Sequence, residues 1–475
     1  MFLGMNKWFL VASLLFSAFV CQSRSMDYYI TSYGAKKDTS VLSTKAIQKA
    51  IDDCAANGGG YVVVPAGSFK TGSIFLRDNV YLYLSPGAVL YGSRSCKDYI
   101  PVQPKYVAYK TGRPTIQLIY GESITNSGIL GEGTIDGQGA FFRQNENFGD
   151  ELISKGEDDG VVGGRPHLIR FITCRNITVK GVSLRSSPCW LQHYLACDNV
   201  CISGLKIFNR ATENNDAIDI DGCRNVVISD IISDTEDDGI TLKSTSPRAT
   251  ENVTITNCTV SSQCNAIKLG TETNGGFKNI TISNCVIKPS YIPEPKPFNG
   301  IEGGLAGLAL EIEDGGILEG VTISNIVVRG TQAPIFIRLG CRSRSWSKDV
   351  KIEHVGQLRN VSISNVQALD VGHVGCSITG IPGHRVENIT LRDVYIELAG
   401  NIEGKTVVEN PAERERNYPE CTMFTGGNHG KGLLPSKGFF VRHAKNVRFE
   451  NVRIHSRVPD ERPDFVFQDV ISDER

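Results

Sequence analysis

The chain has 475 residues, of which 40% are hydrophobic and 21% are charged. Its 50 lysines and arginines nearly balance its 51 aspartates and glutamates, which gives a formal net charge of −1. This balance argues against a nucleic-acid-binding protein, which typically carries a basic excess or a basic patch. The 49 glycines and the recurring short runs rich in valine and isoleucine predict many short strands joined by turns.

The first stretch of the chain has the pattern of a secretory signal peptide. Lys7 precedes an apolar run from Trp8 to Val20, and small and polar residues follow it. Because the run is shorter than the roughly 20 residues of a transmembrane helix, we expect residues 1–23 to be a removed leader and no membrane span. The protein would then be exported, as a periplasmic or secreted protein or as a cell-surface lipoprotein attached through Cys21. An anchoring or core helix is the alternative interpretation of the same run.

An amphipathic helix is predicted in the stretch STKAIQKAIDDCAANGGG, residues 43–60. Ser43 is suited to cap its start, and the glycines end it. Five residues at helical spacing would form its apolar face: Ala46, Ile47, Ala50, Ile51 and Cys54. Strand-like runs follow at once and no low-complexity linker interrupts the chain. Residues 24–475 are therefore predicted to form a single domain, whose open end this helix covers.

A repeat runs through the rest of the chain. Each copy places an asparagine before an aliphatic residue and, in most copies, Thr, Ser or Val, as in CRNITV, CRNVVI and FKNITI. The asparagines are Asn176, Asn199, Asn225, Asn252, Asn279, Asn360, Asn388 and Asn446, with Gly320 at this position in one copy. Such short units cannot fold alone but bury a continuous core when they stack. The repeat therefore predicts an all-β parallel β-helix with a ladder of asparagines.

The 14 cysteines include no CxxC pair and show no spacing typical of a tight disulfide framework. Cys174, Cys197 and Cys223 each lie two residues before a repeat asparagine. We therefore expect these three thiols to form a stacked column and not a metal site.

Three successive coils carry the same polar pattern in front of a strand. The segments are NNDAIDI (Asn214–Ile220), EDDGITL (Glu236–Leu242) and QCNAIKL (Gln263–Leu269). Their alignment places Asp216, Asp238 and Asn265 at one position of each coil, a set that we name the acid column. Because stacked strands lie about 4.8 Å apart, Asp216 and Asp238 should be neighbours, with Asp237 beside them.

Close carboxylates repel one another, so at least one of them should have a raised pKa. One group that gives a proton beside another that takes one suits general acid–base catalysis. Two other interpretations stay open. The aspartates are turn residues only, or they bind Ca²⁺ together with Asp219 and Asp221.

These motifs resemble those of glycoside hydrolase family 28, the polygalacturonase-like right-handed β-helix enzymes, and the resemblance covers most of the chain. Asn214–Asp216 is similar to the family's Asn-Thr-Asp motif, and Asp237-Asp238 follows 21 residues later, as the family's Asp-Asp pair does. The resemblance implies an inverting glycosidase without a metal or cofactor. Asp237 would be its general acid, and Asp216 and Asp238 would hold and deprotonate the attacking water.

The chain departs from the family at two other motifs. The family's Gly-His-Gly falls on Cys264–Ala266, so Asn265 stands in place of the histidine, and its Arg-Ile-Lys falls on Ala309–Glu311. The family binds a galacturonate carboxylate with those two basic residues, which Ala309 and Glu311 cannot do by charge. Either another cation replaces them or the sugar cleaved is uncharged, as in the family's rhamnogalacturonan-directed members.

The predicted substrate contacts are Asn214, Asn265, Lys243, Lys268, Trp190, His193 and Arg338. Lys243, Lys268 and Arg338 are candidates for the replacement cation, together with Arg342 and Arg344, and ordinary surface or paired charges are the alternative for each. Trp190 would stack on a sugar ring and His193 would bond a hydroxyl, whereas a buried tryptophan and a satisfied core histidine are the alternatives.

The sequence thus predicts an exported enzyme that hydrolyses plant cell-wall pectin, with rhamnogalacturonan favoured over homogalacturonan. Two long inserts, residues 288–304 and 407–438, would close one end of a groove, which favours removal of terminal sugars. Three other functions stay open: a polygalacturonase or exo-galacturonosidase, a Ca²⁺-dependent polysaccharide lyase, and a non-catalytic carbohydrate-binding solenoid. A lyase needs a basic residue beside the metal, for which Lys243 and Lys268 are the candidates near the acid column.

Overall fold

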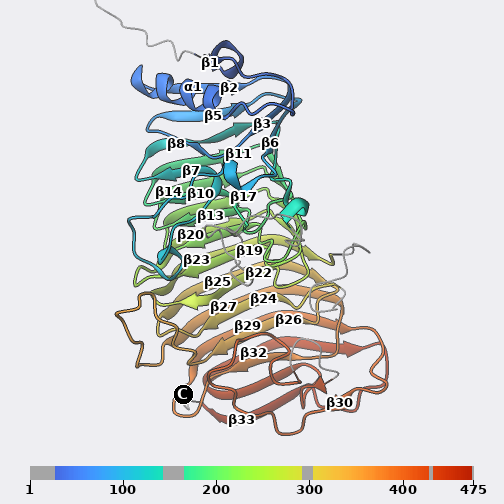
Figure 1. The fold of residues 1–475 in the computed structure, drawn as a ribbon. Coiled ribbons are helices and arrows are strands. Elements are labelled where there is room, and N and C mark those ends of the chain that lie inside the picture. Colours follow the sequence, from blue (N-terminus) through green and yellow to red (C-terminus); the bar gives the residue numbers. More distant parts are fainter. Residues whose placement is uncertain (1–26, 143–164, 291–302, 427–431, 473–475) are drawn as a thin grey trace, which may run out of the picture.

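The computed structural model describes residues 27–142, 165–290, 303–426 and 432–472. The predicted leader and Cys21 lie outside these residues, as does most of the insert at 288–304. The strands stack into one long column, with α1 (Thr44–Ala56) across its first end and β33 (Phe465–Ile471) near the other (Figure 1). Strands of successive coils pair in parallel, which confirms the predicted all-β parallel β-helix with an N-terminal capping helix.

The strands form one continuous parallel network with three faces, because each early coil contributes up to three short strands. Face 1 begins with β1 (Asp27–Tyr29), β2 (Gly60–Val64), β5 (Val80–Leu84), β8 (Thr125–Gly131), β11 (Arg175–Lys180), β14 (Asp198–Ser203), β17 (Arg224–Ser229) and β20 (Thr250–Thr256). Face 2 contains β3 (Gly67–Thr71), β6 (Ala88–Gly92), β9 (Thr134–Asp136), β12 (Ser183–Arg185), β15 (Lys206–Asn209), β18 (Ile232–Thr235) and β21 (Thr259–Ser262).

Face 3 carries the polar segments of the acid column. Its strands are β4 (Ile74–Phe75), β7 (Gln117–Glu122), β10 (His167–Ile172), β13 (Gln192–Leu195), β16 (Ile218–Asp221), β19 (Ile240–Ser244), β22 (Ile267–Thr273), β24 (Ala306–Ile312), β26 (Ala333–Leu339) and β28 (Cys376–Thr379). In the later coils, longer strands continue faces 1 and 2: β23 (Gly276–Lys288), β25 (Ile317–Arg329), β27 (Gln357–Val371), β29 (Val386–Leu398) and β32 (Phe439–Ser456).

The repeat asparagines form the predicted ladder. From Asn176 to Asn279, each side-chain amide donates to the side-chain oxygen of the asparagine one coil earlier, at 2.9–3.1 Å. The ladder begins earlier than the repeat suggested, because Asn176 donates to Asn126 and Asn126 to Asn79. The repeat asparagines have φ values of 55 to 58°, in the left-handed region, which asparagine tolerates better than most residues. The same position therefore turns the chain and joins successive coils.

Aliphatic side chains fill the interior of the stack in register. Ile177, Val200 and Val226 lie directly above one another on three successive coils, and all three are buried. The predicted cysteine column is also present, because the backbone N–H groups of Cys174 and Cys197 donate to the thiols of Cys197 and Cys223. All cysteines within the described residues are free thiols.

Helix α1 buries the apolar face that its spacing predicts. Ile47, Ala50, Ile51 and Cys54 are fully buried against the first coil. The predicted cap is only partly correct, since Ser43 lies at the N-cap position but its side chain makes no capping hydrogen bond. Its hydroxyl accepts a hydrogen bond from the Lys36 N–H instead. No helix in the described ranges is long and apolar enough to cross a membrane.

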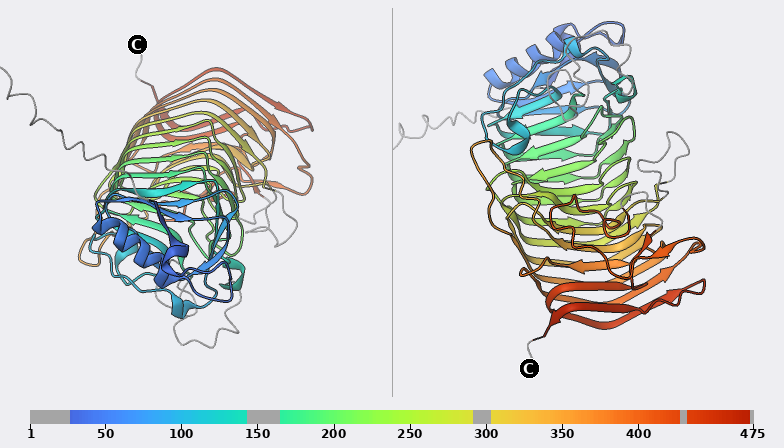
Figure 2. Two further views of the ribbon diagram at one scale, coloured as in Figure 1. Left: turned by 90° about the horizontal axis from the view of Figure 1, so that it is seen from above. Right: turned by 60° about the horizontal axis from the view of Figure 1, so that its bottom comes forward.

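Three irregular segments leave the solenoid and pack on the outside of face 3. They are residues 93–116, which include η2 (Cys96–Asp98) and η3 (Tyr109–Thr111), residues 340–356, and the described parts of residues 399–438, namely 399–426 with β30 (Thr406–Val407) and 432–438 with β31 (Gly432–Leu433). The last of these folds back over earlier coils (Figure 2, right). Arg338, for example, donates to the carbonyls of Glu413 and Arg414 in it. The three segments position a few distant residues against the strands that follow the acid column.

Candidate active site

The acid column forms at the start of three paired strands. Each polar segment follows a short strand of face 2, turns the chain, and enters β16, β19 or β22 of face 3. The Ala217 N–H donates to the Asp238 carbonyl at 3.1 Å, and the Gly239 N–H donates to the Asn265 carbonyl at 2.9 Å. Asp216, Asp238 and Asn265 therefore occupy equivalent positions on successive coils, as the alignment predicted.

Asp237 lies at the accessible edge of this column. It is half-buried, whereas Asp216 and Asp238 are each only 3% exposed. Its Oδ1 accepts a hydrogen bond from the Asp238 N–H at 2.8 Å, and its Oδ2 accepts one from Asn214 Nδ2 at 3.4 Å. The predicted neighbour Asn214 is itself held, since Arg165 donates to its Oδ1 at 2.7 Å. One face of Asp237 is thus fixed by the protein while the group stays reachable from solvent.

The two adjacent aspartates have opposite pKa shifts. Burial and the neighbouring Asp238 charge raise the pKa of Asp237 to about 6. Burial also opposes ionisation of Asp238, but Lys268, Lys243 and two hydrogen bonds from Asn265 outweigh it and lower the pKa of Asp238. Lys268 Nζ lies 3.1 Å from Asp238 Oδ2, and the Asn265 side chain and N–H donate to Asp238 Oδ1 at 2.9 and 3.0 Å. Asp237 therefore holds its proton more readily than an ordinary carboxyl group, whereas the adjacent Asp238 is more readily ionised.

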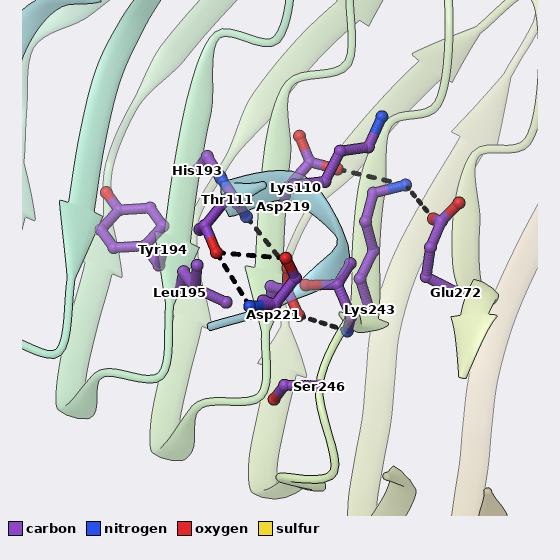
Figure 3. A network of polar contacts seen from close by, with 12 residues as sticks. Lys110, Thr111, His193, Tyr194, Leu195, Asp219, Asp221, Lys243, Ser246 and Glu272 are labelled. Carbon is purple, nitrogen blue, oxygen red and sulfur yellow. Dashed lines mark hydrogen bonds and ion pairs between the residues drawn. The ribbon is translucent and has the colours of Figure 1, made fainter. Parts of the chain in front are cut away.

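A second group of charges lies deeper, beside Asp216. Lys243 Nζ lies 3.9 Å from Asp216. It also lies 3.6 Å from Asp219 and 3.6 Å from Glu272 (Figure 3). Burial and its acidic neighbours raise the pKa of Asp216 well above its usual value. Within the described residues, Asp216 Oδ1 has no hydrogen-bond partner. Because such an unpartnered buried oxygen is costly, this atom is a natural place for a water molecule or a substrate hydroxyl.

The two lysines of the site remain charged. Burial opposes the charge of Lys243, but Glu272, Asp219 and Asp216 outweigh it and raise the pKa of Lys243 well above its usual value. The pKa of Lys268 is raised in the same way, because the charges of Asp238 and Glu311 outweigh the effect of burial. Both lysines therefore neutralise carboxylates and cannot accept a proton near neutral pH.

The arrangement does not fit a metal site. Within the described residues, ligand atoms of Asp237, Asp238 and Cys264 lie within 4.8 Å of one another. However, Asp238 already faces the Lys268 ammonium and the Asn265 amide, and burial raises the pKa of the Cys264 thiol well above its usual value. A hard cation such as Ca²⁺ prefers an all-oxygen shell without a competing ammonium. The calcium interpretation therefore loses its support.

His193 and Trp190, two predicted sugar contacts, lie in the interior, which was the alternative interpretation of both residues. His193 is fully buried, its Nε2 lies 3.1 Å from Asp221 Oδ2, and burial lowers its pKa to about 4 (Figure 3). Trp190 is 5% exposed, and the ammonium groups of Lys110 and Lys243 lie 4.9 and 4.7 Å from its ring centroid. A buried core histidine that contacts Asp221 through one nitrogen, and a buried tryptophan, describe these residues better than contacts with substrate.

The structure places Arg338, another predicted sugar contact, in the interior. Its side chain is fully buried, and it donates to the backbone carbonyls of Gly380, Glu413 and Arg414. It therefore holds the 399–438 segment in place. Lys268 is in register with Ala309 on the next coil, but its charge is committed to Asp238. Neither residue replaces the basic residues that are missing at positions 309 and 311.

Sequence reasoning missed the residues that the outer segments bring to the site. Glu420 Oε2 accepts a hydrogen bond from Asn265 Nδ2 at 3.3 Å, and its Oε1 lies 3.9 Å from Lys268 Nζ. Burial and nearby Asp238, partly offset by Lys268, raise the pKa of Glu420 to about 7. The ring of Tyr418 lies over Lys268, with 5.7 Å between Nζ and the ring centroid. These residues follow the column by about 150 positions in a segment without repeats, so no periodic signal marked them.

The segments 93–116 and 340–356 meet on the other side of the site. The Arg344 guanidinium carbon lies 4.6 Å from the ring centroid of Tyr109, and its Nη1 lies 2.8 Å from Glu272. Arg342 is paired with Asp314. Lys110 and Arg344 are each only half-buried, so the basic groups nearest to the surface here come from these two segments.

Comparisons with known proteins place the chain among glycoside hydrolases. The model of the family described as "Glycosyl hydrolases family 28" matches residues 100–415. A "Probable polygalacturonase" of Vitis vinifera is 30% identical over 249 residues, which are 50% of this chain and 48% of that protein. An "Exo-poly-alpha-D-galacturonosidase" of Dickeya chrysanthemi is 29% identical, over 44% of this chain and 41% of that protein. A "Probable rhamnogalacturonase A" of Aspergillus oryzae is 28% identical, over 45% and 39%.

The chain thus spans about half the length of the curated relatives it matches, or somewhat less. Among solved structures, the family 28 exopolygalacturonase of Yersinia enterocolitica aligns with a TM-score of 0.67 at 19% identity. The alignment covers 94% of this chain and 78% of that one. At this identity the likeness concerns the fold alone, which is the same parallel β-helix.

Proposed function

The chain belongs to glycosyl hydrolases family 28, and we propose that it hydrolyses pectic polysaccharide with inversion of the anomeric carbon. Asp237 would be the general acid, and Asp238 together with Asp216 would activate the water. The observation that carries this proposal is the pair of opposite pKa shifts on Asp237 and Asp238, at the accessible head of β19. A purely structural cluster of acids has no need for one protonated and one ionised carboxyl in adjacent positions.

The proposed reaction is a single displacement. Asp237 gives its proton to the glycosidic oxygen as the bond from this oxygen to the anomeric carbon breaks. A water held at Asp216 Oδ1 and Asp238 attacks the opposite side of the carbon, and Asp238 accepts the proton of this water. Solvent then returns a proton to Asp237. Asn265 and Lys268, which contact Asp238 directly, keep it ionised until the water is deprotonated.

We propose a rhamnogalacturonan-type substrate, with an uncharged sugar in the cleavage subsite. Ala309 and Glu311 stand where a galacturonate carboxylate would need two cations, and Lys268 beside them is committed to Asp238. Glu311 is fully buried, and burial raises its pKa well above the usual value. The half-buried Lys110 is suited to a galacturonate in an adjoining subsite, together with the half-buried Arg344, one nitrogen of which pairs with Glu272. One relative named as a rhamnogalacturonase is consistent with this choice.

We further propose exo action and export. The segments 93–116 and 399–438 stand on opposite sides of the site and limit the space for a chain that continues in both directions. The names of two matched proteins, an exo-poly-alpha-D-galacturonosidase and an exopolygalacturonase, are consistent with this action. Export rests on the leader pattern of residues 1–23 alone.

The test is product release from rhamnogalacturonan and homogalacturonan oligosaccharides in the presence of EDTA. Chromatography and mass would identify the product, and NMR at early times would identify its anomer. We expect a terminal sugar of inverted configuration from rhamnogalacturonan only, unaffected by EDTA. Galacturonate from homogalacturonan would establish an exopolygalacturonase instead. An unsaturated product would contradict hydrolysis, and no product from either substrate would favour a binding solenoid.

A further inference from the structure

A second polar hollow lies away from the acid column, near the end of the solenoid that α1 covers. Its volume is about 830 Å³. Its walls come from residues 37–39, from β3 and β6, and from the turns that follow β6 and β9. The cations Lys37, Lys70 and Arg94 line it, together with the ring of Tyr91 and several hydroxyl groups.

The two acids in the hollow accept hydrogen bonds from serine groups. Asp38 accepts hydrogen bonds from the N–H and the hydroxyl of Ser40, both at 2.8 Å, and Asp98 accepts one from the Ser93 hydroxyl. In the part of the chain that the structure describes, none of the three cations is ion-paired with a carboxylate. Three cations therefore face two acids in the hollow, which leaves a net positive charge for an entering ligand, although Lys70 also attracts Asp38.

Arg94 is held in place before any ligand binds. Its guanidinium carbon lies 3.6 Å from the ring centroid of Phe141, and its Nε donates to Gln138 Oε1 at 2.7 Å. Gln138 is fixed in turn, because its N–H donates to Asp136 and its amide donates to the Gly92 carbonyl. The two terminal nitrogens of Arg94 remain for a ligand. A fixed planar fork of this kind suits the two oxygens of a carboxylate.

The position of the hollow links it to the candidate active site. Gln138 follows β9 of face 2, and Asp237 follows β18, which lies three strands further along the same face. At about 4.8 Å per strand, the two turns are roughly 14 Å apart along the solenoid. A polysaccharide of several sugars can therefore reach from one turn to the other.

We propose that this hollow is a secondary binding site for the uronate carboxylates of pectic oligosaccharides, with Arg94 as the carboxylate fork and Lys37 and Lys70 as supporting charges. The inference rests on the proposed function for the choice of ligand, since a pectic polymer carries regularly spaced carboxylates. Binding here raises the local concentration of polymer near the active site without taking part in the cleavage.

The test measures binding without turnover. Isothermal titration with an oligogalacturonate of about ten sugars is carried out on the full chain that carries Asp237→Asn. We then add Lys37→Gln, Lys70→Gln and Arg94→Gln together. The loss of three charge-assisted contacts should weaken binding about tenfold, and a rise in salt concentration should reduce the difference. Hydrolysis of a short oligosaccharide by the same triple variant, with Asp237 restored, should be unchanged.

The matched control removes three cations from the same end of the molecule. Lys36, Lys45 and Lys49 lie outside the hollow, and all three are exposed. Their joint replacement by Gln should change the affinity less than twofold. Equal losses in the two triple variants, or no loss in either, would overturn the proposal.

Two further outcomes are informative. Displacement by inorganic phosphate beyond the effect of chloride at equal ionic strength would assign the hollow to phosphorylated ligands and overturn the uronate proposal. Failure of the proposed function is a separate result, namely a wild-type protein that releases no sugar from any short pectic oligosaccharide. The binding titration does not depend on that result, because its background variant does not turn over.

Discussion

At the scale of single residues, the pair Asp237 and Asp238 predicts the pH dependence of activity. Asp237 must keep its proton, so activity should fall as the pH rises through about 6, the pKa of this carboxyl. Asp238 must stay ionised, and its lowered pKa should move the acidic limb below the range usual for a carboxyl group. We expect a bell-shaped profile of kcat/KM between these limits, measured with a saturating series of one oligosaccharide.

The substitution Asp237→Asn tests whether Asp237 is the general acid, because an amide has no acidic proton to give to the leaving oxygen. The variant should lose about 10²–10⁴-fold in kcat and the basic limb of the profile, because its amide cannot protonate the leaving oxygen. Its thermal unfolding should stay close to that of the wild type, since Asp237 is half-buried at the edge of the site. A rate within threefold of the wild type would contradict the role of general acid.

His193 predicts that the stability of the protein depends on pH, because this buried histidine is neutral in the folded protein and protonated in the unfolded chain. Burial, only partly offset by the hydrogen bond to Asp221, lowers its pKa to about 4 in the folded protein. The unfolded chain takes up this proton near pH 6.5, so the free energy of unfolding should fall as the pH drops from about 6.5 to about 4. At about 1.4 kcal/mol for each unit of pKa, the loss from this group is about 3 kcal/mol.

The measurement is denaturant unfolding of wild type and His193→Gln at several pH values. The difference in slope between the two proteins isolates His193 from the buried carboxyl groups, whose raised pKa values act in the other direction. His455→Gln is the control, because His455 is exposed. Parallel slopes for wild type and His193→Gln between pH 4 and 6.5 would mean that His193 is charged in the fold.

At the scale of elements, the 399–438 segment completes the site, and Glu420 provides a test of how it does so. Since its pKa is about 7, Glu420 is mostly neutral at the acidic pH where activity is expected. Glu420→Gln should therefore keep kcat/KM within threefold below pH 6, because the amide oxygen can still accept from Asn265. Glu420→Ala should lose about tenfold, because it leaves Asn265 without this partner.

Several groups face Glu420, and the experiment must account for them. Lys268, Asp238 and Glu311 lie on face 3 or just before its strands, and Cys264 donates to Glu420 Oε1 at 3.8 Å. Glu415→Ala is the control, because Glu415 lies in the same segment and is exposed. Equal losses in Glu420→Gln and Glu420→Ala at pH 5 would show that the charge, and not the hydrogen bond, matters.

The coils could be predicted from the sequence and the outer segments could not. The repeat asparagine recurs at a constant position of the coil, so it determined both the fold and the alignment of Asp216, Asp238 and Asn265. Glu420, Tyr418 and Lys110 come from segments without a period, whose placement depends on tertiary packing. The partners of Arg338 could not be predicted for the same reason, because only the folded 399–438 segment shows where its guanidinium donates.

At the scale of the whole molecule, the stack resembles a one-dimensional array whose ends need protection. Each coil buries apolar side chains against the next, so the first coil would expose its interior if α1 did not cover it. Ile51 is fully buried on the inner side of α1, whereas Lys49 is exposed on the same helix. The helix thus offers a buried and an exposed position for one substitution.

Ile51→Asp should destabilise the protein by about 3 kcal/mol or more, because it removes an apolar contact and buries an unpaired carboxylate. Lys49→Asp should change stability by less than about 0.5 kcal/mol, as surface substitutions usually do. Thermal unfolding compares the two, and light scattering tests whether the uncovered end of the first variant pairs with other chains through its strand edges. Because the strands of each coil pair only with strands of neighbouring coils, the damage should be greatest near the first end. Hydrogen exchange should then show β2 and β5 opening before β16 and β19. Equal protection of all coils in Ile51→Asp would mean that the stack unfolds as one unit and that α1 is not a local cap.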